Sequence, residues 1–316
     1  MTTVLSRPAE TTAVPGRRRR RSRETRWALV FLSPWLIGFV VFTAGPMVAS
    51  LVLSFTRYDL INPPEYAGLG NYRELVNDPK VRTALWNTVL YTVLHVPLNM
   101  VLALALASLL LRIGRLSGFF RTVFFLPVMT PPVALAAMFL LLLNGQIGLI
   151  NHGLSFLGIA GPNWTTDPNW IKPGIVVMML WQVGSTVVIY LAAMGGVPPD
   201  LYEAARLDGA SGWRQFRHIT LPMISGALYF TLIVNTIASL QMFTEAYSMY
   251  FGVGANASAE GDAALFYVIY LFQQAFQFLH MGYASALAWL LFLVIMAITI
   301  VQVRLSRRYV YYEGGS

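Results

Sequence analysis

The polar side chains with the clearest chemistry lie within a long apolar segment near residues 222–246. On a helix of 3.6 residues per turn most of them share one stripe, and polar groups at membrane depth normally face other helices or water. They could bind the hydroxyls of a polyhydroxylated solute while an aromatic side chain covers its ring, or they could simply hold helices together. The candidates here are Asn235, Ser239, Gln241, Met242, Phe243 and Glu245, and Trp181 and Gln182 are similar candidates in the preceding apolar segment.

An earlier apolar segment presents a second polar face. Asn87, Tyr91 and His95 follow one another at four-residue spacing, so a helix would place them on one side. This face could line a solute pathway or pack against a neighbouring helix, and the sequence leaves both interpretations open.

Other chemistries are not supported. The chain has no cysteine, which excludes disulfides and thiolate chemistry. No Gly-x-x-x-x-Gly-Lys-Ser/Thr sequence is present, and no pair of carboxylates or Ser/His arrangement lies at membrane depth, so we expect no catalytic residue and no ATP hydrolysis by this chain. Cofactors and metal ions are not expected either, because the four histidines lack ligand spacing: His95, His152, His218 and His280.

The elements that must position these residues are apolar segments of membrane-spanning length. Of the 316 residues, 56% are hydrophobic and only 11% are charged, and the mean hydropathy is +0.59. Because a helix needs about 20 apolar residues to cross the hydrocarbon core, the sequence predicts an all-α membrane protein with six transmembrane helices. The predicted spans lie near residues 27–55, 85–111, 122–143, 173–196, 222–246 and 283–303.

The basic residues predict the orientation of the spans. They gather at both ends of the chain and in the loops after the second and fourth spans, as expected of segments facing the cytoplasm, although the loop after the first span also carries basic residues. We therefore expect both termini to be cytoplasmic, with a disordered basic tail over 1–24, a transmembrane domain over 25–310 and a short tail over 311–316. The positive charge suits contact with membrane lipid better than with nucleic acid.

The fourth loop, residues 197–221, has clear local structure. Asp200 is a good N-cap, and Glu203 completes a capping box three residues later, so a short helix is expected over Leu201–Leu207. Asp208 and Gly209 form a natural stop. Ser211 can cap a second short helix, which makes the loop a helical elbow on the cytoplasmic face.

The same loop resembles the EAA loop of ABC importer permeases. Glu203-Ala204-Ala205, then Gly209, and then Leu221-Pro222 fill the fixed positions of that pattern. In that family the loop is the coupling helix that docks in a cleft of the ATPase subunit. The resemblance therefore implies an ATPase-coupling role for Leu201, Glu203, Ala204, Ala205, Asp208, Gly209, Leu221 and Pro222.

Further segments are similar to the carbohydrate-uptake branch of that family, of the maltose and glycerol-3-phosphate type. Tyr66-Ala-Gly-Leu-Gly-Asn-Tyr72, Gly148-Leu-Ile-Asn151 and Gly282-Tyr-Ala-Ser-Ala-Leu287 resemble elements of the first permease of the pair. The stretch Thr244–Gly254 departs from the family pattern. The resemblance implies a type I ABC importer permease-like bundle that works with a second homologous permease, a cytoplasmic ABC ATPase dimer and an extracytoplasmic substrate-binding protein.

The sequence thus predicts a non-catalytic, multi-pass permease of the bacterial inner membrane that imports a sugar or related solute by alternating access. An ion-coupled carrier acting alone is one alternative, but ionisable residues within the predicted spans are few. A membrane-embedded enzyme is the other, and it lacks a recognisable site. No residue distinguishes oligosaccharides, monosaccharides, polyols and glycerol-3-phosphate as cargo, although the lack of Lys and Arg in the predicted later spans favours a neutral sugar.

Overall fold

The computed structural model describes residues 17–251 and 262–309 of the chain. By its contacts the chain divides into two units, Met1–Val52 and Leu53–Ser316. The first unit contains α1 (Arg17–Phe39), the π-helical turn η1 (Val40–Ala44) and α2, which ends just beyond it (Gly45–Leu53). Trp27–Leu53 is long and apolar enough to cross a membrane, as predicted for the first span.

The amino-terminal tail differs from the expectation. Helix α1 begins at Arg17, so residues 17–24 continue the first helix instead of forming part of a disordered tail. Arginine is a good helix former, and an apolar helix that follows directly can extend into an arginine run. Residues 1–16 and the predicted tail over 311–316 lie outside the described residues.

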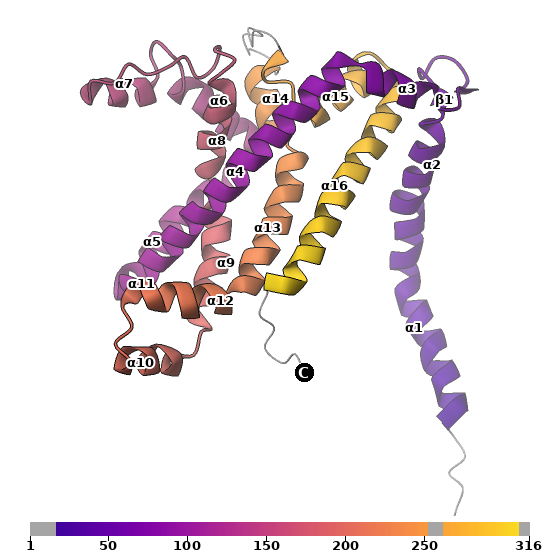
Figure 1. Cartoon of the computed structure of the whole chain (residues 1–316). Helices are drawn as coiled ribbons and strands as arrows, with labels where there is room; N and C mark the ends of the chain where they lie inside the picture. Colours follow the sequence, from indigo (N-terminus) through magenta and orange to yellow (C-terminus); the bar gives the residue numbers. More distant parts are fainter. Residues whose placement is uncertain (1–16, 252–261, 310–316) are drawn as a thin grey trace, which may run out of the picture. The chain divides into compact units, whose positions relative to one another are not determined.

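The second unit is a bundle of helices with one short hairpin (Figure 1). Its first half contains β1 (Thr56–Arg57), β2 (Glu65–Tyr66), α3 (Gly70–Asn77), α4 (Pro79–Arg112), η2 (Gly114–Leu116), α5 (Ser117–Phe125), η3 (Leu126–Met129), α6 (Pro132–Leu142) and α7 (Leu149–Phe156). Its second half contains α8 (Ile171–Leu180), α9 (Gly184–Gly195), α10 (Pro199–Leu207), α11 (Gly212–Gln215), η4 (Phe216–Thr220), α12 (Leu221–Met223), α13 (Ser225–Leu240), α14 (Thr244–Tyr250), α15 (Tyr267–Phe272), η6 (Gln273–Gln277) and α16 (Met281–Tyr309).

Four of the six predicted spans correspond to single stretches, and the other two correspond to bent helix pairs. Over the described residues, four stretches are long and apolar enough to cross a membrane: Trp27–Leu53, Pro79–Arg112, Ser225–Tyr250 and Met281–Ser306. Two helix pairs pass the same test together, with bends of 99° between Ser117–Met129 and Pro132–Leu142 and of 49° between Ile171–Leu180 and Gly184–Gly195. The all-helical membrane fold is therefore confirmed, and the count of six spans stays a prediction that requires each bent pair to act as one span.

Proline explains the sharper bend. Pro131 and Pro132 lack the N–H groups that would continue the helix from η3, and a residue before proline avoids the α conformation. Thr130 is accordingly extended, with φ −73° and ψ 126°. Pro97, by contrast, lies within α4, which continues through it to Arg112.

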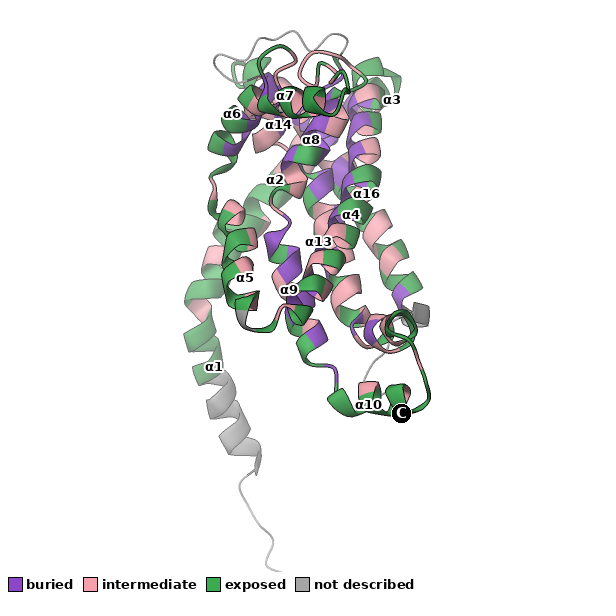
Figure 2. Ribbon diagram, turned by 90° about the vertical axis from the view of Figure 1, so that its left-hand side faces the viewer, coloured by how far each residue is buried: buried purple, intermediate pink, exposed green. Residues whose placement is uncertain are grey.

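Helix α4 forms the centre of the second unit. It packs against α8, α9, α13 and α15, and small residues such as Ala103 and Ala107 allow close approach. Figure 2 shows buried residues along α8 and α9, whereas α5 and α10 are largely exposed. Tyr190 of α9 and Thr231 of α13 share a buried hydrogen bond of 2.6 Å, which joins these two helices directly.

The motif around Asn71 and Tyr72 fastens the hairpin to α3. Asn71 Nδ2 donates to the carbonyl oxygens of Ser54 and Thr56, at 2.8 and 2.9 Å. A hydrogen bond of 2.8 Å joins the hydroxyls of Tyr72 and Ser54. The hairpin pairs Thr56 with Tyr66 in antiparallel register. The segment Tyr66–Tyr72 therefore has a structural role, because its first residue pairs in the hairpin and its last two residues hold the hairpin to α3.

Asp78 joins three helices at the start of α4. Its carboxylate caps α4 by accepting from the Lys80 N–H at 2.8 Å, and it accepts hydrogen bonds from the hydroxyls of Tyr270 and Tyr283. Partial burial acts to raise the Asp78 pKa, but the hydrogen bonds from Tyr270, Tyr283 and the backbone outweigh it and hold the pKa below its usual value.

Because the Asp78 pKa is lowered in the folded protein, we expect the stability of the fold to decrease at acidic pH. The stabilising effect is complete above the unfolded pKa of about 3.9 and is lost as pH falls through the lower folded pKa. Thermal unfolding of the purified protein at pH 7 and near pH 3 measures the loss. The Asp78→Asn variant has no carboxyl group at this position to titrate. It should be less stable than the wild type at pH 7, but its stability should fall less when the pH is lowered. Equal losses in both proteins would contradict the role of Asp78.

Candidate functional site

The elbow predicted for residues 197–221 is present at one end of the bundle (Figure 1). Its first helix, α10, begins earlier than expected, at Pro199, and Pro198 occupies the N-cap position. Asp200 therefore lies in the first turn and is not the N-cap, so that detail of the prediction is wrong. Proline is favoured at the first helical position, where its missing N–H costs nothing, and Asp200 still opposes the helix dipole favourably.

Gly209 ends α10 as expected. Its φ of +73° lies in the left-handed region that suits glycine. The N–H of Ala210 donates to the Ala205 carbonyl at 2.8 Å and the N–H of Gly209 donates to the Arg206 carbonyl at 3.0 Å, which together form a Schellman motif. The turn therefore depends on glycine at this position.

The second part of the elbow connects to α13. Ser211 is the N-cap of α11, where its Oγ accepts from the Arg214 N–H at 3.4 Å, as predicted. Pro222 has no N–H for the His218 carbonyl four residues earlier, and the wider π-helical turn η4 directly precedes α12. A 2.9 Å hydrogen bond between the hydroxyls of Tyr202 and Thr220 ties α10 to this segment.

The outer surface of the elbow is exposed and partly apolar. Leu201, Glu203, Ala204, Asp208 and Gly209 are exposed, whereas Ala205 and Leu221 are half-buried. Leu207 lies in the predicted coupling helix but was not named among the coupling residues, and Trp213 was not named either; their side chains are 90% and 69% exposed. Their apolar character was visible in the sequence, but the same loop also contains Leu201, Phe216 and Ile219, so residue type alone did not single them out.

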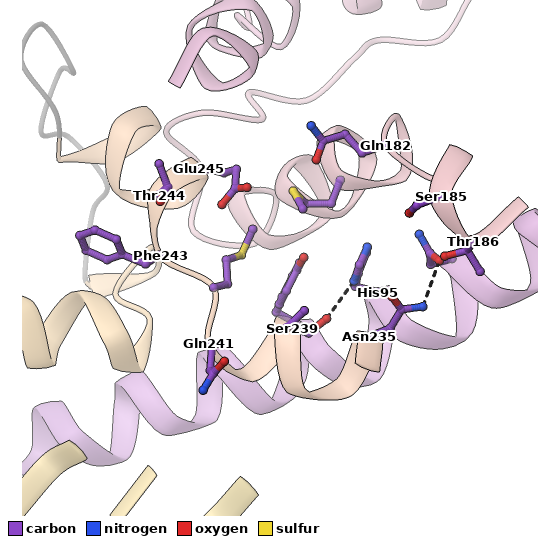
Figure 3. Close-up of a pocket in the computed structure, with 15 residues that line it drawn as sticks. His95, Gln182, Ser185, Thr186, Asn235, Ser239, Gln241, Phe243, Thr244 and Glu245 are labelled. Atoms are coloured by element: carbon purple, nitrogen blue, oxygen red, sulfur yellow. Dashed lines mark hydrogen bonds between the residues drawn. The ribbon is translucent and has the colours of Figure 1, made fainter. Parts of the chain in front are cut away.

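The second candidate site is a cavity of about 290 Å³ between α4, α9, α13 and α14. Most of the predicted pathway residues line it, and Figure 3 shows polar side chains from α9, α13 and α14 around His95. The predicted residues that line it are Gln182, Asn235, Ser239, Gln241, Met242, Phe243 and Glu245. Trp181 does not line it: this side chain is exposed and packs edge-on against Phe139 at 6.3 Å.

The predicted stripe on one continuous helix is only partly present. Helix α13 ends at Leu240, and Gln241 to Phe243 form a break before α14 begins at Thr244. Glu245 consequently reaches the cavity from the first turn of a different helix. Gln241 is exposed and points away from the His95–Ser239 pair in Figure 3.

The cavity also contains residues of α4 that the sequence left ambiguous. His95 is 7% exposed, its Nδ1 shares a 3.0 Å hydrogen bond with Ser239 Oγ, and its ring stacks on Tyr91 at 5.2 Å. Its Nε2 has no partner among the described residues. Asn235 Nδ2 donates to Asn99 Oδ1 at 3.4 Å. Asn87, by contrast, serves packing, because its amide donates to the carbonyls of Asp262 and Leu265.

The electrostatics of the cavity are simple. Among the described residues that line it, Glu245 is the one carboxylate and there is no lysine or arginine. The Glu245 carboxylate accepts no hydrogen bond within the described part of the chain. Its half-buried position makes it a natural acceptor for hydroxyl groups that a solute would bring.

The fold and these two sites define a class of protein, the polytopic helical membrane protein whose bundle encloses a polar cavity. A family model described as "Binding-protein-dependent transport system inner membrane component" matches residues 99–311. The chain belongs to this family of ABC transporter permeases, and it is a non-catalytic, multi-pass subunit of the inner membrane.

Several relatives cover nearly the whole chain. It is 38% identical to the probable ABC transporter permease protein YesP of Bacillus subtilis over 90% of this chain and 91% of that one. It is 34% identical to the lactose transport system permease protein LacF of Rhizobium radiobacter, over 88% and 93%. It is 31% identical to the arabinooligosaccharides transport system permease protein AraP of Bacillus subtilis, over 88% and 87%.

A solved structure supports the fold. One chain of a bacterial ABC transporter involved in the import of the acidic polysaccharide alginate superposes with a TM-score of 0.78 at 23% identity, over 92% of this chain and 99% of that one.

Proposed function

We propose that this chain is the translocating permease of an importer for a sugar or related polyhydroxylated solute. The observation that carries the proposal is the polar cavity, whose hydroxyl, amide and carboxylate groups lie beside Tyr91 and Phe243. Hydrogen-bonding groups around an aromatic face suit a sugar ring. The names of the lactose and arabinooligosaccharide permeases among the relatives add support for a carbohydrate cargo.

The elbow is the proposed docking surface for a cytoplasmic ATPase dimer, which would bind the ATP, and this chain would hold no cofactor. Leu201, Glu203, Ala204, Ala205, Asp208 and Gly209 form or flank the exposed helix, with Leu221 and Pro222 at the return to the bundle. The elbow end carries Arg112, Arg206, Arg214 and Arg217, which supports the proposal that this end faces the cytoplasm. Both termini carry basic residues as well, and they are proposed to be cytoplasmic for the same reason.

Contacts from the elbow to the cavity supply a route for alternating access. Tyr202 and Phe216 of the elbow pack against an apolar cluster that includes Met194 and Ile224. Met194 belongs to α9, which also carries the cavity residues Ser185 and Thr186, and Ile224 directly precedes α13. Movement of α10 driven by the ATPase would therefore shift two walls of the cavity together.

The remaining partners are proposed on the same basis. A second homologous permease would complete the pathway, and an extracytoplasmic substrate-binding protein would deliver the cargo, in keeping with the binding-protein-dependent family. One structural neighbour is described as an alginate transporter in complex with an alginate pentasaccharide-bound periplasmic protein.

The decisive experiment is purification of the tagged chain from its native membrane in mild detergent, with mass spectrometry of what accompanies it. We expect an ATPase to co-purify with the wild type and to be lost with Gly209→Arg, because a bulky charge at the Schellman turn disrupts docking. Gly212→Ala is the matched control, since a methyl group there meets no atom within 4 Å. An intact membrane chain without any ATPase would favour an ion-coupled carrier that acts alone, with Glu245 and His95 as its ionisable groups.

A further inference from the structure

The loop between α6 and α8 exposes several large apolar side chains. Five large apolar side chains in and around α7 are at least half exposed, Phe156 by 79%. We call this surface the apolar ledge and define it by Ile147, Leu149, Phe156, Leu157 and Ile159. It lies outside the cavity and outside the elbow, and neither proposed site uses it.

The loop is fastened so that the ledge cannot turn inward. Asn151 Nδ2 donates to the carbonyls of Gly145 and Pro162, at 3.0 and 2.9 Å, and Asn151 Oδ1 accepts from Trp164 Nε1 at 2.8 Å. Gly161 lies so close to Asn151 that a Cβ atom would fall 2.1 Å from its Oδ1. Asn151 therefore fixes one face of α7 toward the loop and leaves the ledge outside.

The position and composition of the loop indicate what covers the ledge. Helix α7 lies at the end of the bundle opposite α10 and projects outward beside α6, at a steep angle to α13 and α16 (Figure 1). Its loop joins two segments of membrane-spanning character, and Trp164 and Trp170 form an edge-on pair at 5.0 Å at its base. Tryptophan is enriched at the membrane–water interface.

The absence of charged residues around the ledge also indicates contact with lipid. Residues 122–166 contain no aspartate, glutamate, lysine or arginine. A surface that docked reversibly on a soluble protein would ordinarily have a polar rim. The exposed polar neighbours of the ledge are Gln146, His152 and Ser155, and none of them is a carboxylate, a lysine or an arginine. A short helix with an apolar face at the end of two spans is instead suited to the boundary between headgroups and acyl chains.

We propose that α7 is an interfacial helix whose apolar ledge inserts into the lipid leaflet at the end of the bundle opposite the elbow. The partner is the lipid surface itself. Helix α7 is the next helix after α6, from which residues 143–148 separate it. The contact with lipid therefore anchors α6, the half of the bent span that lies beyond the 99° break.

The chain has no cysteine, so single cysteines can be introduced without a background. Phe156→Cys and Leu149→Cys place a spin label on the ledge, and Ser155→Cys, about 100° from Phe156 around the helix, is the exposed matched control. The complete transporter is reconstituted in phospholipid vesicles. Collision rates are then measured with oxygen, which concentrates in lipid, and with a water-soluble nickel chelate.

We expect labels at 149 and 156 to collide several-fold more with oxygen than with the chelate, and the label at 155 to show the reverse. All three positions are exposed, so labelling should leave the fold intact, and retained uptake confirms it. Chelate-dominated collisions at 149 and 156 would overturn the proposal, because the ledge would then face water. Low collision rates with both reagents would also overturn it, because a protein surface would then cover the ledge. A label at Leu157→Cys should likewise collide more with oxygen than with the nickel chelate.

Discussion

Leu207→Asp is expected to abolish uptake while the protein remains in the membrane and retains its cavity. Leu207 is the last residue of α10, two positions before Gly209, and 90% of its side chain is exposed. An apolar side chain held out in this way is the kind of residue that fills a pocket on a partner. Loss of an interface hot spot costs about 2–4 kcal/mol, which corresponds to a roughly 30- to 700-fold loss of affinity.

The matched control for this variant is Leu207→Met, which keeps the volume and apolar character and should transport almost normally. Uptake of labelled cargo by whole cells and ATPase co-purification are measured in parallel. Glu203→Ala should also impair both measurements, because Glu203 is exposed on the same helix. If Leu207→Asp retains both uptake and the ATPase, α10 is not the docking surface.

Glu245→Lys is expected to have the second large effect, the loss of transport with the ATPase still bound. The variant would place a cation where the cavity holds its one described carboxylate, and it would remove the acceptor for cargo hydroxyls. A hydrogen bond to a charged group contributes about 1.5–3 kcal/mol, which is roughly a 10- to 150-fold change in affinity. Glu245→Gln keeps an oxygen acceptor and should lose less.

Gln241→Ala is the comparison variant: Gln241 lines the cavity, but it is exposed at the helix break and points away from His95 and Ser239, so its loss should matter less. The concentration dependence of uptake separates the two variants: Glu245→Gln should raise the half-saturating cargo concentration, whereas Gln241→Ala should raise it less. Normal uptake by Glu245→Lys would remove Glu245 from the cargo pathway. A larger effect of Gln241→Ala than of Glu245→Gln would also contradict the assignment of Glu245 as the main cargo contact.

The break after Leu240 shows where local pattern stops being informative. A 3.6-residue period assumes one helix, and it placed Ser239 and Glu245 on one stripe. In the structure they lie on different helices and still line one cavity, because the turn at Gln241 to Phe243 redirects α14. Trp181 was a reasonable candidate by residue type, but it occupies the bend between α8 and α9 and faces outward.

The sequence by itself determined the features that depend on neighbouring residues along the chain. Its apolar segments required a membrane, Gly209 and Ser211 determined the turn and cap of the elbow, and Pro131 and Pro132 marked the bend before α6. The tertiary structure alone decided which polar residues meet. His95 and Ser239 are separated by 144 positions and share a hydrogen bond because α4 and α13 pack together, and no local spacing encodes that contact.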